Sequence, residues 1–347
     1  MKLYLFDQIL ETHVVDALSS ALLAEGHSVT LSGPVWQGHR FPERPEDISM
    51  IHEKIDEMLA EQPDAMFNFR ASSLLPEHIL RIRKAGVRTI VWFPDDPVLY
   101  NLVYGKIIDL YDIPLHCGDQ RVLNFYHYHG HTTGINFPFW LDPAVFNYVY
   151  DPSAATGNVV FFGNMHGPIR QGRYDIVCSS HTDVSIYGKV ASDPRGRVKG
   201  IINGPAETVK VLGTYRIGIN IAQEFSSYAN TQYDYPGLAM LGAFFLPSRV
   251  LQYASTGLPV VTVQTMRQDD AHCPPGFHAR DAESAGLLIK RLLEHPDYLV
   301  KISKAARRIV EQRFSGRQRV KLLEYLLTGQ SIADFTMHER EMMYQWF

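Results

Sequence analysis

Cysteine is scarce in this sequence of 347 residues, which holds only Cys117, Cys178 and Cys273. They lie far apart and form no CxxC pair, and any disulfide scheme would leave one of them unpaired. Neither a disulfide framework nor a cysteine-based metal site is therefore indicated, and this usage is typical of a reducing compartment. We expect a cytoplasmic protein.

Long apolar runs and an excess of basic charge are also lacking. No segment reaches the roughly 20 apolar residues that a membrane-spanning helix needs, and the N-terminus MKLYLFDQIL has too short an apolar core for a secretory signal. Lys and Arg number 33 against 37 Asp and Glu, a net charge of -4, so there is no electrostatic footprint for a phosphate backbone. We expect no membrane span, and nucleic acid is not indicated as a partner.

What the sequence does contain is a repeated alternation of short apolar strands and helices. At 347 residues the chain exceeds the size at which one hydrophobic core stops growing, so two domains are expected. Strands alternating with helices predict parallel sheets with right-handed crossovers. The predicted fold class is α/β, with two Rossmann-like domains facing a cleft. We expect strands at 3–6, 28–31, 65–69, 89–93, 113–116 and 132–135, and then at 159–162, 184–187, 217–221 and 260–263.

The domain boundaries follow from where this alternation stops. A stretch with several prolines and no clean period interrupts it, and the pattern then restarts. The predicted organisation is a first domain at 1–142, a connection at 143–157, a second domain at 158–328, and a C-terminal helix at 329–347 that packs back on the body through its apolar residues.

The segment 242–263, GAFFLPSRVLQYASTGLPVVTV, combines a helix with a buried strand. Ser248 is expected to cap the helix, and Arg249 and Gln252 then share one of its faces. A basic group and an amide on the first turns of a helix in an open α/β sheet suit a ligand site. An ordinary crossover helix with a solvated arginine is an equally good interpretation of this helix alone.

Two loops that follow strands carry further cationic groups. FFGNMHGPIR places Gly163 and Asn164 after a strand and Arg170 near a helix start, where loop amides and an arginine favour an anion such as a diphosphate. The spacing is neither GxGxxG nor a P-loop, so dinucleotide and Mg-ATP binding are not indicated. SIYGKV places Lys189 at the end of the next strand. A solvated lysine is the usual alternative, but two cations from separate loops favour an anionic ligand.

Paired carboxylates and abundant histidines raise the question of a metal. Asp95 and Asp96 in WFPDDPV close a strand, where they could act as a general base, bind sugar hydroxyls or hold a metal; alternatively they cap the next helix. No third ligand is placed beside them, so we expect no structural metal. The alternating histidines of YHYHGH, at 127, 129 and 131, bridge a helix end and a strand and imply no tetrahedral zinc set.

Taken together, these segments resemble the glycosyltransferases of GT-B type, and more narrowly the spore-maturation (CgeB-like) glycosyltransferase family. The resemblance rests on a colinear series that spans most of the chain: DDP at 95–97, FPFWLDPAVF at 137–146, FFGNMHGPIR at 161–170, IYGK at 186–189, TYRIGINI at 214–221 and PSRVLQYASTGLPVV at 247–261.

The resemblance implies that the C-terminal domain holds a nucleotide-sugar donor and that the N-terminal domain holds the acceptor. It implies a donor site that includes Gly163, Asn164, Arg170, Tyr187, Gly188, Lys189, Ser248, Arg249 and Gln252. The family commonly has Glu where this chain has Gln252, for bonding the donor ribose; Gln still donates and accepts hydrogen bonds but carries no charge. No metal and no cofactor are implied, and a UDP-sugar is weakly favoured as the co-substrate.

The chemistry implied is glycosyl transfer to a hydroxyl, with the charge of the leaving diphosphate stabilised by Arg170, Lys189 and Arg249 in place of a metal. Asp95 or Asp96 would deprotonate or orient the acceptor if the enzyme inverts; if it retains, the donor phosphate could serve and the aspartates only position. Two alternatives stay open: a nucleotide-sugar epimerase or hydrolase, and a non-catalytic nucleotide-sugar-binding protein. The acceptor and the oligomeric state are not indicated by these residues.

Overall fold

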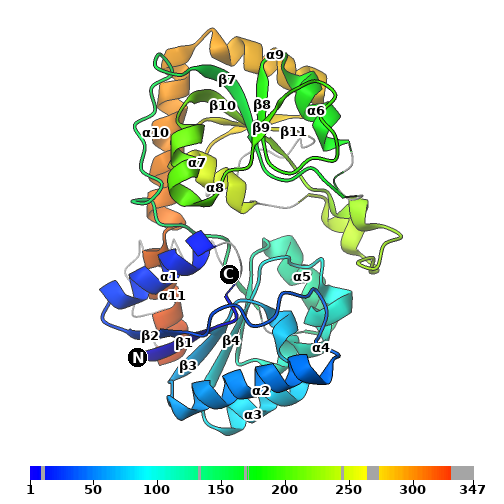
Figure 1. Cartoon of the computed structure of the whole chain (residues 1–347), viewed down its shortest axis with the longest axis vertical. Coiled ribbons are helices and arrows are strands. Elements are labelled where there is room, and N and C mark those ends of the chain that lie inside the picture. Colours follow the sequence, from blue (N-terminus) through cyan, green and yellow to red (C-terminus); the bar gives the residue numbers. More distant parts are fainter. Residues whose placement is uncertain are drawn as a thin grey trace. The chain divides into compact units, whose positions relative to one another are not determined.

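The computed structural model describes residues 1–8, 12–131, 134–167, 170, 172–243, 246–263 and 273–329. The chain forms two compact units (Figure 1). Unit 1 comprises Met1–Phe139 and the segments that begin at Phe225 and at Gly316, and unit 2 comprises Trp140–Glu224 and Leu246–Ser315. The helix predicted at 329–347 lies outside the described residues except for its first one. No helix in the described part of the chain is both long and apolar enough to cross a membrane.

Unit 1 is built on a six-stranded sheet in the order β2-β1-β3-β4-β5-β6, with every described pair parallel. Apolar side chains occupy both faces of its central strands, which is what a parallel sheet covered by helices requires. The strands are β1 (Lys2–Phe6), β2 (Ser28–Leu31), β3 (Ala65–Asn68), β4 (Arg88–Phe93), β5 (Ile113–His116) and β6 (Ile135–Asn136).

Helices cover this sheet, and Figure 1 shows α1 beside α11, and α2 beside α3. The helices are α1 (Thr12–Ala24), α2 (Pro45–Ala60), α3 (Pro76–Lys84), α4 (Gly105–Ile107), α5 (Gln120–Tyr128) and α11 (Gly316–Thr328). Where one helix was predicted near 102–110, the chain instead makes a π-helical turn at Tyr100–Tyr104, then α4, then a 3-10 turn at Ile108–Leu110.

Unit 2 repeats the design with a second six-stranded parallel sheet in the order β12-β11-β10-β7-β8-β9. Its strands are β7 (Gly157–Phe162), β8 (Val184–Tyr187), β9 (Val198–Gly200), β10 (Tyr215–Ile221), β11 (Val260–Val263) and β12 (Phe277–Ala279). Its helices are α6 (Arg173–Ser180), α7 (Gly204–Leu212), α8 (Ser248–Ser255), α9 (Ala282–Leu293) and α10 (Pro296–Arg313). The short edge strands β9 and β12 were not predicted. The predicted fold class, α/β with two Rossmann-like domains, is confirmed.

Two segments lie in a different unit from the one that the sequence boundaries placed them in. Residues of the segment after Phe225, such as Leu238, join the apolar core of unit 1. Helix α11 also belongs to unit 1, because Gly316 allows close contact with the backbone of α1: a Cβ on Gly316 would lie 2.1 Å from the Ala17 carbonyl oxygen. The buried Arg319 then donates to the carbonyl oxygen of Pro138 at 3.1 Å.

Helix α8 begins one residue away from the predicted position. Pro247 occupies the N-cap, in an extended conformation, and Ser248 is the first helical residue. The predicted capping role of Ser248 is therefore wrong. Proline fits this position because its fixed backbone angle suits the approach to a helix and its missing N–H costs nothing there.

Candidate functional site

The sheet of unit 2 has its topological switch point between β7 and β10. From β7 the chain moves to β8 on one side and later to β10 on the other. In open parallel sheets, ligands bind outside the carboxyl ends of the strands at such a point. The residues that follow β7 and β8, and those at the end of β10, are therefore the ones to consider first.

Two glycines bring the loops after β7 and β8 into direct backbone contact. The Gly163 N–H donates to the Tyr187 carbonyl at 2.8 Å. Gly163 and Gly188 have φ angles of +139° and +150°, which side chains disfavour. A Cβ on Gly188 would lie 2.1 Å from the Gly163 carbonyl oxygen, so only glycine fits there. At the carboxyl ends of β7 and β8, the backbone of Gly163 and Gly188 therefore forms a surface without side chains of its own, which we call the floor of backbone.

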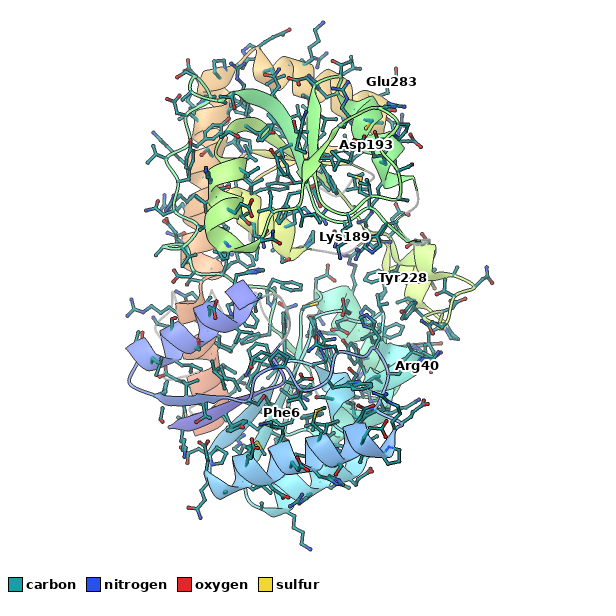
Figure 2. All side chains as sticks on the ribbon, viewed as in Figure 1. Phe6, Arg40, Lys189, Asp193, Tyr228 and Glu283 are labelled. Atoms are coloured by element: carbon teal, nitrogen blue, oxygen red, sulfur yellow. The ribbon has the colours of Figure 1, made fainter. Side chains whose placement is uncertain are left out.

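Asn164 and Lys189 extend this contact between the two loops. The Lys189 N–H donates to Asn164 Oδ1 at 3.0 Å, and the Lys189 carbonyl accepts from the Met165 N–H at 2.8 Å. Figure 2 shows Lys189 in the loop that follows β8, and its side chain is exposed. The backbone of Lys189 is thus fixed while its ammonium group stays available to a ligand.

Arg249 reaches the same place from α8. Its guanidinium lies 4.8 Å from the centre of the Phe161 ring, and Nη1 donates to Asn220 Oδ1 at 3.4 Å. It also lies against Gly163, where a Cβ would come within 2.4 Å of Nη2. The half-buried Arg249 side chain is therefore held at the ends of β7 and β10, with its Cζ over the Phe161 ring.

Tyr253, one turn later on α8, fixes the helix against the sheet. Its hydroxyl accepts from the Phe162 N–H at 2.7 Å and donates to the Ile219 carbonyl at 3.1 Å, so one side chain bonds both β7 and β10. Complete burial raises the pKa of this phenol well above its usual range. Tyr253 thus fixes α8, the helix that carries Arg249, against β7 and β10.

The other predicted donor residues are placed as follows. Ser248 is half-buried in the first turn of α8, and Gln252 is 7% exposed one turn after Arg249's position. The Tyr187 hydroxyl lies 3.3 Å from that of Tyr215, and burial raises the pKa of Tyr187 to about 12. Arg170 is exposed, beyond the Gly163 loop, and its N–H donates to the Gly167 carbonyl at 3.2 Å.

Contacts described for unit 2 therefore join Gly163, Asn164, Gly188, Lys189 and Arg249 into one cluster. The sequence interpretation did not include Asn220, the partner of Arg249. A buried asparagine in the otherwise apolar strand GINI was the signal that could have identified it. Arg173 begins α6, is buried, and hydrogen-bonds Gln223 Oε1 after β10, so it supports the loop and is not a surface cation.

In unit 1, the two aspartates of the DDP segment have different environments. Asp95 is exposed. Asp96 is 0% exposed, and both of its oxygens are bonded: Oδ2 to His116 Nδ1 at 2.6 Å and Oδ1 to the Tyr126 hydroxyl at 2.6 Å. Asp96 also lies within a ring cluster that includes Phe93, whose ring centre is 5.2 Å from that of His116. Of the pair, Asp95 is the carboxylate that solvent reaches.

Metal-binding geometry is absent from the part of the chain that is described: no group of three or more His, Cys, Asp or Glu residues there could hold an ion. The alternating histidines have separate partners. His131 Nδ1 lies 2.8 Å from Asp109 and its Nε2 lies 3.1 Å from the Tyr100 hydroxyl, while His129 Nε2 lies 3.2 Å from the Pro236 carbonyl.

No family model and no curated protein matches the chain. Several solved structures share its fold. One, described as trehalose-6-phosphate from E. coli bound with UDP-2-fluoro glucose, has a TM-score of 0.60 and 9% identity, covering 94% of this chain and 99% of that one. Anabaena HepE in complex with UDP has a TM-score of 0.58 and 10% identity over 95% and 100% of the two chains.

A third structure, AviGT4, is a glycosyltransferase involved in avilamycin A biosynthesis; its TM-score is 0.56 at 15% identity, with 95% of this chain and 99% of that chain covered. These matches span nearly the whole of both chains, so the likeness includes both units and their order. The chain therefore has the two-domain GT-B fold.

Proposed function

We propose that this protein is a glycosyltransferase that moves a sugar from a nucleoside-diphosphate sugar to an acceptor hydroxyl without a metal. The observation that carries the proposal is the cluster at the switch point of unit 2, where Arg249 and Lys189 meet a floor of backbone made by Gly163 and Gly188. A fixed guanidinium, an exposed ammonium and close backbone are what a diphosphate requires.

The donor's diphosphate would bind at the backbone of Gly163 and Gly188, beside the guanidinium of Arg249, which occupies the side-chain space of Gly163. Arg249 would bond phosphate oxygens from a position that Phe161 and Asn220 already hold, so little entropy is lost on binding. Lys189 and Arg170, which are both exposed, would supply further positive charge. These cations would stabilise the leaving diphosphate as a metal does elsewhere.

The remaining donor contacts are proposed from position on α8. Gln252 lies one turn beyond Arg249 and is nearly buried, so its amide can bond vicinal hydroxyls of the donor ribose. Ser248 begins the same helix. Two structures with this fold hold uridine nucleotides, UDP and UDP-2-fluoro glucose, which supports a UDP-sugar as the donor. The colinear motifs further support the closer relation to the CgeB-like family.

Binding and turnover together test the proposal. Calorimetry with UDP, GDP and UMP should give tighter binding of a diphosphate than of the monophosphate, and UDP-sugars incubated with acceptor mixtures should release UDP. Epimerised or hydrolysed donor without need of an acceptor would instead indicate an epimerase or hydrolase. Tight binding of the UDP-sugar, with no release of UDP in the presence of any acceptor, would indicate a binding protein and would contradict glycosyl transfer.

A cytoplasmic location is proposed from cysteine usage. Cys117 and Cys178 are free thiols in the structure, and both are buried. Redox-sensitive fluorescent tagging or fractionation of the native source would test this location.

A further inference from the structure

Strand β10 presents two residues in turn to helix α8. Gly218 lies against Tyr253, because a Cβ on this glycine would come within 3.1 Å of the Tyr253 ring. Asn220 follows two residues later, on the same face of the strand. It contacts Arg249, which is one turn before Tyr253 in α8. The carboxyl end of β10 therefore places an amide against the guanidinium of the proposed donor site.

Asn220 is a buried amide in an apolar strand. It is 2% exposed and lies between Ile219 and Ile221, which are equally buried. An amide in such a place costs free energy unless it is hydrogen-bonded. Its Oδ1 accepts from Arg249 Nη1 at 3.4 Å, and its Nδ2 donates to Thr262 Oγ1, also at 3.4 Å. Both ends of the amide are thus in use.

The two partners determine which way the amide is turned. A guanidinium has only N–H donors, so the oxygen of Asn220 must face Arg249. The amide nitrogen then faces β11, where Thr262 is paired directly opposite Asn220 in the parallel sheet. A hydroxyl can accept from this nitrogen, whereas the reverse orientation would set N–H donors against the guanidinium. A chain of side chains therefore runs from β11 through β10 to α8.

An amide differs from the other side chains that could stand at this position. A carboxylate would pair with Arg249, neutralise its charge and compete with a phosphate for the same N–H groups. An apolar side chain would offer no acceptor. The bond from Arg249 to Asn220, at 3.4 Å, is longer than the usual distance of about 2.9–3.0 Å. Asn220 can therefore orient the guanidinium while leaving its charge to a ligand.

We propose that Asn220 is a positioning residue of the donor site, which orients Arg249 for the diphosphate without neutralising it, and that Thr262 keeps the amide turned correctly. This proposal rests on the proposed function, because the diphosphate is the ligand that Arg249 would bind. Neither Asn220 nor Thr262 contacts the donor in this proposal. Both act through the guanidinium.

Three substitutions separate charge, hydrogen bonding and orientation. Asn220→Asp keeps the size of the side chain and adds the negative charge. Asn220→Leu removes the acceptor without adding a charge. Thr262→Val removes the hydroxyl that accepts from the amide nitrogen. Asn203→Asp is the matched control, because it makes the same chemical change in the same unit, at an exposed position before α7.

Calorimetry with UDP at one ionic strength measures the effect of each substitution. Asn220→Asp should weaken UDP binding by about tenfold or more, because the new carboxylate takes a charged hydrogen bond from the phosphates. Asn220→Leu should weaken binding by a smaller factor, and Thr262→Val by a smaller factor again. Asn203→Asp should bind UDP as the wild type does.

A double-mutant cycle with Arg249→Ala distinguishes positioning from a merely structural role. In the Arg249→Ala background, Asn220→Asp should change the Kd for UDP by less than about twofold, because the residue through which it acts is gone. A structural role would weaken UDP binding equally in both backgrounds. Thermal unfolding of each variant shows that the fold is retained. Thr262→Val, which adds no charge, provides the test if Asn220→Asp does not fold.

UDP affinity of Asn220→Asp within threefold of the wild type would overturn the role of Asn220 while leaving the glycosyltransferase proposal intact. Equal weakening with and without Arg249 would overturn it too, as would an unchanged Kd for UDP in Thr262→Val where the buried aspartate prevents folding. A wild-type protein that binds no nucleoside diphosphate would instead refute the proposed donor site, and the role of Asn220 with it.

Discussion

The guanidinium of Arg249 fills the space in which a side chain at Gly163 would begin, with Nη2 2.4 Å from the position of a Cβ. The two residues depend on each other. Because Gly163 has no side chain, the guanidinium of Arg249 can reach the carboxyl end of the sheet. The position is further set by the Phe161 ring under the guanidinium.

Gly163→Ala should therefore weaken UDP binding by roughly tenfold or more, because the new methyl displaces Arg249 and leaves the phosphates without a charged hydrogen-bond donor. Calorimetry measures the change. Gly196→Ala is the matched control: it also has a positive φ, +63°, but no atom within 4 Å of its Cβ. Equal affinity of the two variants for UDP would contradict the role given to the glycine.

Arg170→Ala and Lys189→Ala should each weaken binding of UDP by about tenfold, with the fold intact, because both side chains are exposed and removing them leaves no buried gap. Affinity for UMP should change less, since the predicted contacts are with the diphosphate. Lys199→Ala, an exposed lysine of β9, serves as the control. Unchanged UDP affinity in both variants would reject this placement of the phosphates.

Asp95→Asn should lower turnover without a comparable loss of donor affinity, whereas Asp96→Asn should mainly destabilise unit 1. Asp96 is buried and bonds His116 and Tyr126, so the substitution weakens these two hydrogen bonds. Each hydrogen bond to a charged group contributes at most about 1.5–3 kcal/mol to the free energy of unfolding. Thermal unfolding distinguishes them. A full-activity Asp95→Asn would remove that carboxylate from the mechanism.

The difference in stability between the wild type and the Asp7→Asn variant should depend on pH in a defined direction. Burial raises the pKa of Asp7 from 3.8 to about 6, so the fold favours the protonated carboxyl. This contribution to stability is fully present below pH 4 and is lost as the pH rises through 6. Asp7→Asn should therefore unfold with a free energy higher by on the order of 2 kcal/mol at pH 7.5, and by much less at pH 4.

Denaturant unfolding of wild type and variant at the two pH values measures this difference. A variant that is less stable than the wild type at pH 7.5 would show that the hydrogen bonds from the Val35 and Trp36 N–H groups to Asp7 Oδ1 depend on its charge.

Gly316→Ala should destabilise unit 1, because its Cβ would overlap the Ala17 carbonyl oxygen at 2.1 Å and push α11 away from α1. Overpacking of this kind costs about 1–3 kcal/mol, and thermal unfolding measures it. Gly26→Ala, at the end of α1, has no atom within 4 Å of its Cβ and tests the cost of the substitution alone, including its positive φ of +82°. Equal thermal shifts would mean that the α1–α11 contact is not tight.

The alternation of strands and helices could be predicted because its signals are local. An apolar run such as Val260–Val263 fits a doubly covered strand wherever the strand lies in the sheet. The same reasoning failed where neighbours decide the outcome. The short strands β9 and β12 depend on pairing with β8 and β11, and α11 joins unit 1 through contacts with a helix almost 300 positions earlier in the chain.

By itself, then, the sequence determined the fold class, most of the succession of elements, the loops in which Gly163, Gly188 and Lys189 lie, and the helix that carries Arg249. Only the tertiary structure decided which residues of these loops meet. Strand order creates a switch point at β7 and β10 and another at β1 and β3, and strand order is set by long-range pairing that no local pattern records. That is why Arg249 could be proposed from the sequence, whereas its contacts with Phe161, Gly163 and Asn220 became visible only in the folded chain.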